Sequence, residues 1–359
     1  MAQTYRFTRP FTAAACSLLR RRGPASRYLT LALCLGAMQA AQAGSDASAA
    51  LRQIPEAAAT LDYEGTFVNQ REGAVQSFRL SHVGGAREGG YTQIETLDGT
   101  PRSVISHGER KLTFLPQRKT VIASTQLNAS TFPVLFSAER VDAVLRNYEV
   151  HALGEDRVAG QACHLSELRP RDAQRYTYRL CTERATGLLL RAQILDAQQR
   201  PIEQVGFTDL HIGALPEARR RALVQRFDAQ SGWTRIDVPL APVRADEATL
   251  RLREPVPGFS ALGEWRQPMA ARAPGEEPVS VVQAVFSDGV TGVSVFVEPV
   301  GTSSREARRV ANGATHLLSS RQGDVWVTVV GEAPFATLQR FASSIEYKAR
   351  QTVQSLPRQ

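Results

Sequence analysis

The sequence predicts an α+β protein with two domains, each an antiparallel sheet accompanied by helices. Three observations support this prediction. Short β-rich runs separated by turn residues fill the stretch from Tyr63 to about Ile212. A single helical spacing of apolar residues interrupts them at Thr131–Tyr148. Two more hairpin patterns and a terminal helix pattern follow residue 246, and 359 residues are enough for two cores.

Residues 1–43 have the pattern of a secretory signal peptide. The arginines Arg20–Arg22 precede an apolar segment, Tyr28–Met38, and small residues suit a cleavage near Ala43-Gly44. The apolar segment is shorter than a membrane-spanning helix. We therefore expect a cleaved leader and a mature protein outside the cytoplasm, with an uncleaved membrane anchor as the alternative.

The net charge of the mature protein is close to neutral. The whole chain has 43 basic and 35 acidic residues, a net charge of +8. Residues 1–43 contain six of the arginines and no acid, so the remainder carries only +2. The basic character that would indicate a nucleic-acid partner is thus mostly in the leader, and we expect no nucleic acid partner.

Residues 44–214 are predicted to form the first domain. Its expected strands alternate with turns such as Asp98-Gly99 and His107-Gly108. The expected strands are Tyr63–Val68, Val75–Val83, Tyr91–Leu97, Ser103–His107, Leu112–Leu115, Thr120–Ala123, Cys163–Leu168, Arg175–Thr182, Leu188–Asp196 and Glu203–Ile212. With helices at 49–59 and Thr131–Tyr148, such a set can form a strongly curved sheet whose hollow side the helices cover.

Residues 215–245 are predicted to be a linker, because an arginine cluster is followed by Pro239 and Pro242. The cluster is a candidate site for an acidic partner or a lipid phosphate. A solvated connector is the alternative that its charge favours. The arginines concerned are Arg219, Arg220, Arg221 and Arg226.

Residues 246–348 are predicted to form the second, smaller domain. A first hairpin joins Val279–Phe286 to Val290–Val297, and a second joins Thr315–Ser319 to Val325–Val330. Pro334 then opens an amphipathic helix that should cover the small sheet. Residues 349–359 should be a frayed tail.

Cys163 and Cys181 are the two cysteines outside the leader. They lie in two expected strands joined by the turn Arg169–Asp172. Residue 172, in this turn, is midway between the two cysteines in the sequence. A hairpin centred there places the sulfur atoms opposite each other, so we expect a structural disulfide, with two free thiols as the alternative.

Catalytic and metal-binding patterns are missing from the sequence. The six histidines are scattered, at 82, 107, 151, 164, 211 and 316, without metal-ligand spacing. We find no nucleophile constellation, which argues against the alternative of an envelope hydrolase. We therefore expect no catalytic residue, no metal and no cofactor, and a function in binding.

Short motifs in both halves of the chain carry a family resemblance. In the first half they are Leu61–Phe67 (LDYEGTF), Arg175–Leu180 (RYTYRL), Thr186–Arg191 (TGLLLR) and Glu203–Val205 (EQV). In the second half they are Val256–Phe259 (VPGF), Phe286–Gly289 (FSDG) and Val329–Glu332 (VVGE). Their order over roughly residues 50–348 resembles the periplasmic sigma-E regulatory protein family RseB/MucB.

This resemblance implies a first domain like the lipoprotein carrier LolA, an open half-barrel with helices over its hollow. It also implies a periplasmic protein that binds the periplasmic part of a membrane anti-sigma factor and shields it from proteolysis. Acyl chains of mislocalised lipoproteins or of lipopolysaccharide would displace it. A lipoprotein carrier is the alternative function, and the sequence leaves open whether the chain forms a homo-oligomer.

A curved sheet with one apolar face and a helical lid offers a cavity for acyl chains. By alternation we expect the sheet to line it with Phe67, Phe78, Leu80, Leu112, Phe114, Leu188 and Leu190, and the lid with Phe132, Leu135 and Phe136. The alternative for each of these residues is an ordinary place in the core.

Overall fold

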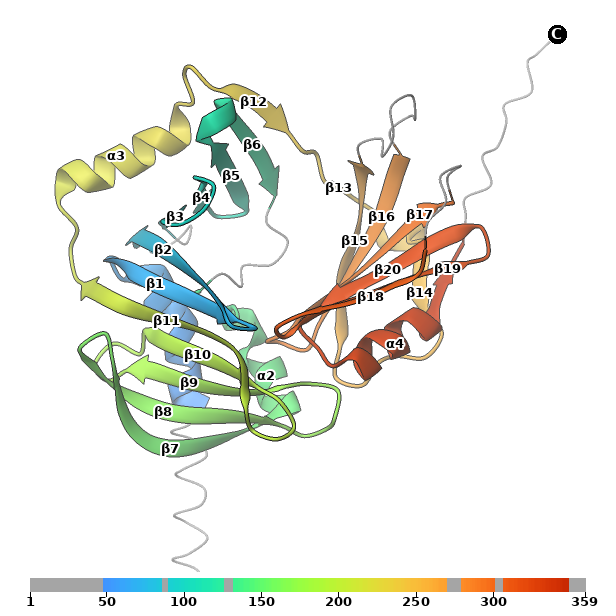
Figure 1. The fold of residues 1–359 in the computed structure, drawn as a ribbon, viewed down its shortest axis with the longest axis horizontal. Helices are drawn as coiled ribbons and strands as arrows, with labels where there is room; N and C mark the ends of the chain where they lie inside the picture. Colours follow the sequence, from blue (N-terminus) through green and yellow to red (C-terminus); the bar gives the residue numbers. More distant parts are fainter. Residues whose placement is uncertain (1–47, 86–89, 126–131, 270–278, 301–305, 349–359) are drawn as a thin grey trace, which may run out of the picture. The chain divides into compact units, whose positions relative to one another are not determined.

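The computed structural model describes residues 48–85, 90–125, 132–269, 279–300 and 306–348. The expected leader, its cleavage point near Ala43-Gly44 and the tail 349–359 lie outside these residues. Within them the α+β prediction is confirmed: a large antiparallel sheet precedes a smaller one that ends in a helix (Figure 1).

The first sheet has the order β12-β6-β5-β4-β3-β2-β1-β11-β10-β9-β8-β7 in the described residues. All neighbours pair antiparallel except β12 and β6, which are parallel. The strands are β1 Tyr63–Arg71, β2 Ala74–Val83, β3 Tyr91–Thr96, β4 Ser103–His107, β5 Arg110–Leu115, β6 Thr120–Thr125, β7 Tyr148–Val158, β8 Gln161–Pro170, β9 Thr177–Glu183, β10 Leu189–Leu195, β11 Pro201–Ile212 and β12 Thr234–Asp237.

Helices cover both faces of this sheet. A helix over residues 48–60 and α2 (Val141–Asn147) pack against one face, where Leu51 and Val144 are buried with Tyr178 of β9. We call this the inner face. On the opposite face, α3 (Glu217–Asp228) buries Phe227 against Phe114. Short 3-10 turns occupy Pro116–Arg118, Ala138–Arg140 and Ala245–Glu247.

The helix predicted over Thr131–Tyr148 is shorter than expected. Residue 131 is outside the described part, residues 132–137 are not helical, and α2 ends at Asn147. Pro133 disfavours the helical conformation of Phe132, the residue before it, but it does not account for the non-helical residues 134–137. Tyr148 then opens β7, a strand that the sequence did not predict. This strand lies at the sheet edge, and most of its side chains are exposed without alternation.

The expected linker 215–245 is not a solvated connector throughout, because α3 within it packs on the first sheet. Leu223 and Phe227, one turn apart, anchor α3 on the first sheet. The chain then adds β12 to the edge of that sheet, and β13 (Ala241–Pro242) pairs with the second sheet. Only two of the twelve residues of α3 are buried, so its apolar pattern is too weak to predict a packed helix from the sequence.

The second sheet has the order β13-β15-β16-β17-β20-β19-β18, and β14 pairs with β21 separately. Its strands are β14 Leu250–Leu252, β15 Ser260–Met269, β16 Val279–Ser287, β17 Gly292–Pro299, β18 Arg308–Asn312, β19 Thr315–Gln322, β20 Val325–Gly331 and β21 Ile345–Tyr347. The amphipathic helix α4 (Phe335–Ser344) buries Leu338 and Phe341 against Val295 and Val329. Both predicted hairpins and the terminal helix are therefore confirmed.

Candidate binding site

A cavity of about 430 Å³, which we call cavity A, lies on the inner face of the first sheet. One part of its wall is apolar, and the other part carries charged groups. The apolar wall includes Phe67, Phe78, Ile94, Phe132, Val134 and Leu135. The polar wall includes Asn69, Arg71, Arg102, Lys111, Glu203 and Glu332. A cavity of this size and mixed lining is suited to an amphiphilic small molecule.

A second cavity of about 620 Å³, cavity B, adjoins the first, because Ile94, Val104, Lys111 and Val134 line both. Its wall includes His82, whose ring stacks on Tyr63 with 4.8 Å between centroids. Burial lowers the pKa of His82, so this wall carries a neutral imidazole at pH 7. Together the two cavities extend over the strands β1 to β5 and β9 to β11.

Four of the ten predicted lining residues do line cavity A: Phe67 and Phe78 from the sheet, and Phe132 and Leu135 from the expected lid. The Phe132 ring lies 5.1 Å from Phe67 and 4.9 Å from Phe207, measured between centroids. This part of the lid is held by aromatic packing rather than by helical hydrogen bonds.

The other six predicted lining residues are core residues in this structure. Leu80, Leu188 and Leu190 are fully buried in one apolar cluster, and Phe136 is buried in another. Leu112 and Phe114 lie on the opposite face, beneath α3. The cavity side of β5 is formed instead by Lys111 and Thr113. Alternation correctly groups Leu112 with Phe114, but it does not say which face they share.

The polar wall of cavity A is a charged cluster shared by both domains. Arg71 Nη2 donates to Glu203 Oε1 at 2.5 Å, and the Ala314 N–H donates to Glu203 Oε2 at 3.3 Å. Burial, together with the charge of Glu203, raises the pKa of Glu332 to about 6, while Arg71 opposes this shift. An arginine of the first domain thus pairs with one carboxylate, Glu203, and acts through its charge on another, Glu332 of the second domain.

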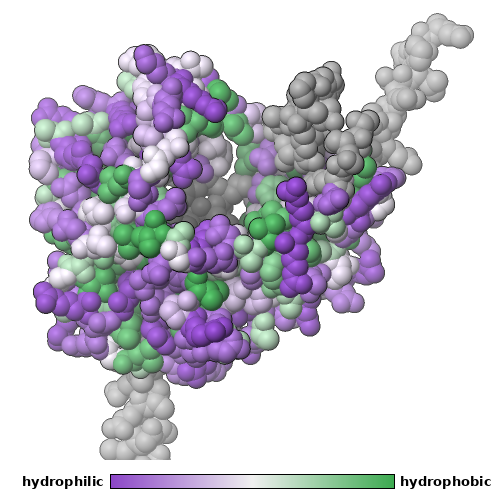
Figure 2. Space-filling view, in the orientation of Figure 1, coloured by the Kyte–Doolittle hydropathy of each residue, from purple (hydrophilic) through white to green (hydrophobic). Residues whose placement is uncertain are grey.

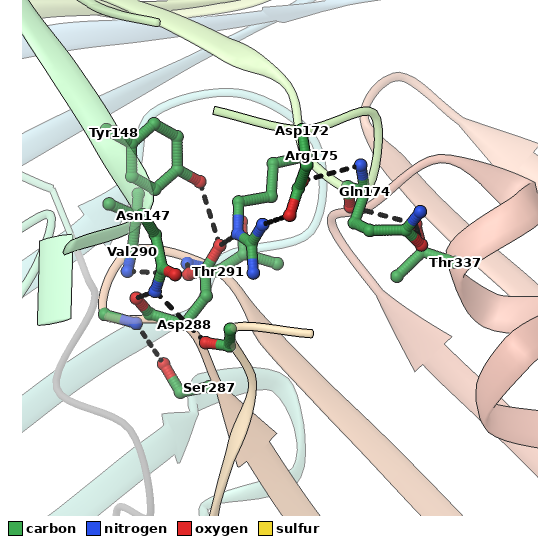
Figure 3. A network of polar contacts seen from close by, with 12 residues as sticks. Asn147, Tyr148, Asp172, Gln174, Arg175, Ser287, Asp288, Val290, Thr291 and Thr337 are labelled. Carbon is green, nitrogen blue, oxygen red and sulfur yellow. Dashed lines mark hydrogen bonds and ion pairs between the residues drawn. The ribbon is translucent and has the colours of Figure 1, made fainter. Parts of the chain in front are cut away.

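A buried polar network forms a second contact between the domains (Figure 3). Asp288, in the turn between β16 and β17, accepts hydrogen bonds from Arg175 Nε at 2.7 Å and Tyr148 Oη at 2.9 Å. Its other oxygen accepts from the N–H groups of Val290 and Thr291. Burial raises the pKa of Asp288, although these donors favour its charged form.

Local sequence patterns do not reveal this network, because its two halves are far apart in the chain. Asp288 falls in the expected turn of a hairpin and Arg175 begins an expected strand, and neither position indicates a contact between them. Asn147 Nδ2 and Arg175 Nη2 also donate to the backbone carbonyls of Asp288 and Pro257. The motifs around Arg175 and Asp288, which carry the family resemblance, were the available signal.

The four arginines of α3 differ in their surroundings. Arg220 forms an ion pair with Asp62, and Arg219 Nη2 donates to Ser81 Oγ at 3.2 Å. The Arg226 guanidinium lies 4.9 Å above the Phe114 ring. Arg221 pairs with Glu217 of its own helix, and its side chain is 68% exposed. Three of the four therefore hold α3 on the sheet, and Arg221 is the one best placed to meet a partner.

The expected disulfide between Cys163 and Cys181 is present, with 5.5 Å between the Cα atoms. The register differs from the prediction, because Cys181 pairs with Leu165 and Cys163 with Glu183. The cysteines are thus diagonal rather than direct neighbours. The hairpin is centred one residue later than expected, which shifts the pairing by two.

No helix among the described residues has the length and apolar character needed to cross a membrane. In the same residues, His, Cys, Asp and Glu side chains form no group of three or more that could hold a metal ion. The most exposed large apolar side chains, such as Val75 and Val310, are scattered. Figure 2 accordingly shows a mainly hydrophilic face with small apolar groups. The apolar lining of cavities A and B is therefore the more specific candidate site.

Comparison with known families matches nearly all of the described chain. The family model of the MucB/RseB N-terminal domain covers residues 46–228, and that of the MucB/RseB C-terminal domain covers residues 244–346. The chain belongs to the MucB/RseB family. The suspected resemblance is thereby confirmed over both domains.

Named relatives agree with this MucB/RseB assignment. The sigma factor AlgU regulatory protein MucB of Pseudomonas aeruginosa is 30% identical over 90% of this chain and 98% of its own. The sigma-E factor regulatory protein RseB of Haemophilus influenzae is 25% identical over 89% and 97%. A crystal structure of MucB in complex with MucA(peri) matches with a TM-score of 0.63 and 26% identity, over 84% of this chain and 99% of that one.

Proposed function

We propose that this chain is a periplasmic regulator of a sigma-E-type factor, and that it acts by binding the periplasmic segment of a membrane anti-sigma factor. Binding would shield that segment from the protease that begins its degradation. The chain is proposed to act as a binding protein and not as an enzyme.

The observation that carries this proposal is the likeness to MucB solved with MucA(peri), which spans both domains of the chain. The printed names of the relatives, regulatory proteins of AlgU and of sigma-E, point to the same role. The periplasmic location is supported by the partner domain named in that complex and by the leader pattern of residues 1–43.

Cavity A supports a second part of the proposal, in which acyl chains of lipoproteins or lipopolysaccharide release the partner. Each methylene moved from water into an apolar cavity contributes about 0.8 kcal/mol. Phe67, Phe78 and Phe132 offer such a surface. Opposition between lipid and partner then requires only that the two ligands favour different conformations.

Titration calorimetry with the purified protein and the periplasmic segment of the MucA-like protein encoded by the same organism tests the proposal. We expect a Kd of micromolar or below, and slower proteolysis of the segment in the complex. Absence of binding at micromolar concentrations would overturn it.

A lipoprotein carrier is the competing function, since cavities A and B are also what a carrier needs. The second domain contributes Val290 and Glu332 to the wall of cavity A, which a carrier that uses only the first domain does not explain. Transfer of an acylated peptide to vesicles, without any effect on partner binding, would favour the carrier.

A further inference from the structure

Arg71 lies where cavity A meets both domains, and its hydrogen bonding is incomplete. Nη2 bonds to Glu203, whereas Nε is buried and has no hydrogen-bond partner among the described residues. Asn69 Oδ1, two residues earlier on β1, is in the same situation. A buried donor without an acceptor costs stability. The Nε atom itself is shielded, but the Arg71 side chain lines cavity A and is 29% exposed, so an acceptor on a ligand in the cavity can meet the rest of its guanidinium.

The second domain packs directly on this arginine. Gly313, in the turn between β18 and β19, has φ +60°, and a methyl group added there would collide with Arg71 Cγ. The next residue, Ala314, is fully buried and donates its N–H to Glu203. Glu332 of the second domain also lines cavity A and is influenced by the charges of Arg71 and Glu203.

We propose that Arg71 is the residue that selects an anionic headgroup in cavity A, and that its capture by the headgroup loosens the contact between the domains. This inference rests on the proposed function, in which the cavity holds an acyl chain. The chain would lie against the apolar wall, and a phosphate or carboxylate would accept hydrogen bonds from the arginine fork.

The coupling follows from charge. Without ligand, Arg71 offsets the negative charges of Glu203 in the first domain and Glu332 in the second. An anionic headgroup takes part of that positive charge, and the two carboxylates then repel each other across the domain contact. A neutral headgroup takes none of it. An anionic and a neutral amphiphile should therefore affect the Gly313-Ala314 turn differently, even when both occupy the cavity.

Three probes that share the same hydrocarbon chain length test the selection: dodecyl phosphate, dodecanoate and monododecanoylglycerol. Arg71→Gln should weaken binding of the phosphate about tenfold to a hundredfold and that of dodecanoate in the same direction. It should leave monododecanoylglycerol within about twofold. Arg71→Lys, which keeps the charge but not the fork, should lose less. The control is Arg79→Gln, since Arg79 pairs with Glu95 and does not line the cavity.

Hydrogen exchange tests the coupling. Dodecyl phosphate should increase exchange of the Ala314 amide in the wild type, monododecanoylglycerol should not, and Glu332→Gln should reduce the increase. Two results would overturn this inference and leave the proposed function standing. One is an equal loss of affinity for all three probes in Arg71→Gln, and the other is unchanged exchange of the Ala314 amide when dodecyl phosphate binds. If no probe binds the wild type, the acyl-chain part of the proposed function fails with it.

Discussion

Arg175 and Asp288, one from each domain, form an ion pair in which the two side chains are 1% and 0% exposed and the Nε–Oδ2 distance is 2.7 Å. Such a pair must be completely hydrogen-bonded to be stable, since both charges have lost their water. Tyr148 and the backbone N–H groups of Val290 and Thr291 meet this need for Asp288. Asp172 and the Pro257 carbonyl meet it for Arg175. The pair therefore specifies one particular docking of the turn after β16.

Asp288→Asn should lower the free energy of unfolding by about 2–3 kcal/mol, because it removes the buried one of the two carboxylates that pair with Arg175, the other being Asp172. Urea unfolding followed by circular dichroism measures this. Asp237→Asn is the matched control, because Asp237 pairs with Arg235 at the surface and is 66% exposed. The control should change stability by less than about 1 kcal/mol. Similar effects of the two variants would show that the buried pair is not special.

Gly289→Ala should disturb the same docking by a steric route. Gly289 has φ +112°, and an added Cβ would lie 2.8 Å from the backbone nitrogen of Val144 in α2. Gly232→Ala separates this clash from backbone strain, since Gly232 has φ +80° with nothing within 4 Å of its Cβ. We expect Gly289→Ala to lower the melting temperature clearly more than Gly232→Ala. Equal shifts would assign the effect to φ alone.

Glu332→Gln should change stability in a pH-dependent way. The pKa of Glu332 is raised from 4.5 to about 6, so the folded state holds the proton more tightly than the unfolded state. The favourable contribution of that proton is complete below pH 4.5 and is lost as the pH rises through 6. At pH 7.5 the variant should thus be more stable by up to about 2 kcal/mol.

Urea titrations at pH 4 and pH 7.5 test this difference, and the gain at pH 7.5 should disappear at pH 4. Glu346→Gln, at a half-exposed carboxylate of the second domain, should show no such dependence. A gain of the same size at both pH values would mean that Glu332 is not the titrating group.

Removal of the disulfide should destabilise the first domain by about 3 kcal/mol, from the loop entropy of a separation of 18 residues. A Cys163→Ala/Cys181→Ala variant and reduced wild type should both show the loss in urea unfolding. Thiol titration of the unfolded, unreduced mature protein should find no reactive thiol. Two reactive thiols would exclude the bridge in solution.

The arginines of α3 should separate into two classes. Arg220→Gln removes the ion pair with Asp62. That carboxyl's pKa is lowered, despite partial burial, by N–H groups of Gly84 and Leu215 and by Arg220. Arg220→Gln should therefore reduce the stability of the fold without a specific effect on binding of the partner. Arg221→Glu should leave stability within about 1 kcal/mol.

If α3 contacts an acidic partner, Arg221→Glu should weaken binding most strongly at low salt. Calorimetry at two salt concentrations decides this. Unchanged affinity at both would limit the four arginines to holding α3.

Much of the fold could be predicted from the sequence, because hairpins such as β16–β17 combine alternation with a clear turn. Edge strands such as β7 and β18 could not, since residues exposed on both faces do not alternate. The contact of Arg175 with Asp288 joins positions 113 residues apart, and periodicity carries no information at that range. The cavity was predicted, but its charged wall was not, because Arg71 and Glu332 meet only after two domains dock.

The parallel pairing of β12 with β6 shortens the connection between the two sheets. The Val238 N–H still donates to the Ala123 carbonyl at 2.8 Å, and Ala241 already pairs with Arg266. The intervening chain can span only about 10 Å. If the contacts at Arg71 or Arg175 were to open, this tether would keep the two surfaces at a local concentration of about millimolar. Reclosure is then unimolecular and independent of how much protein the cell makes.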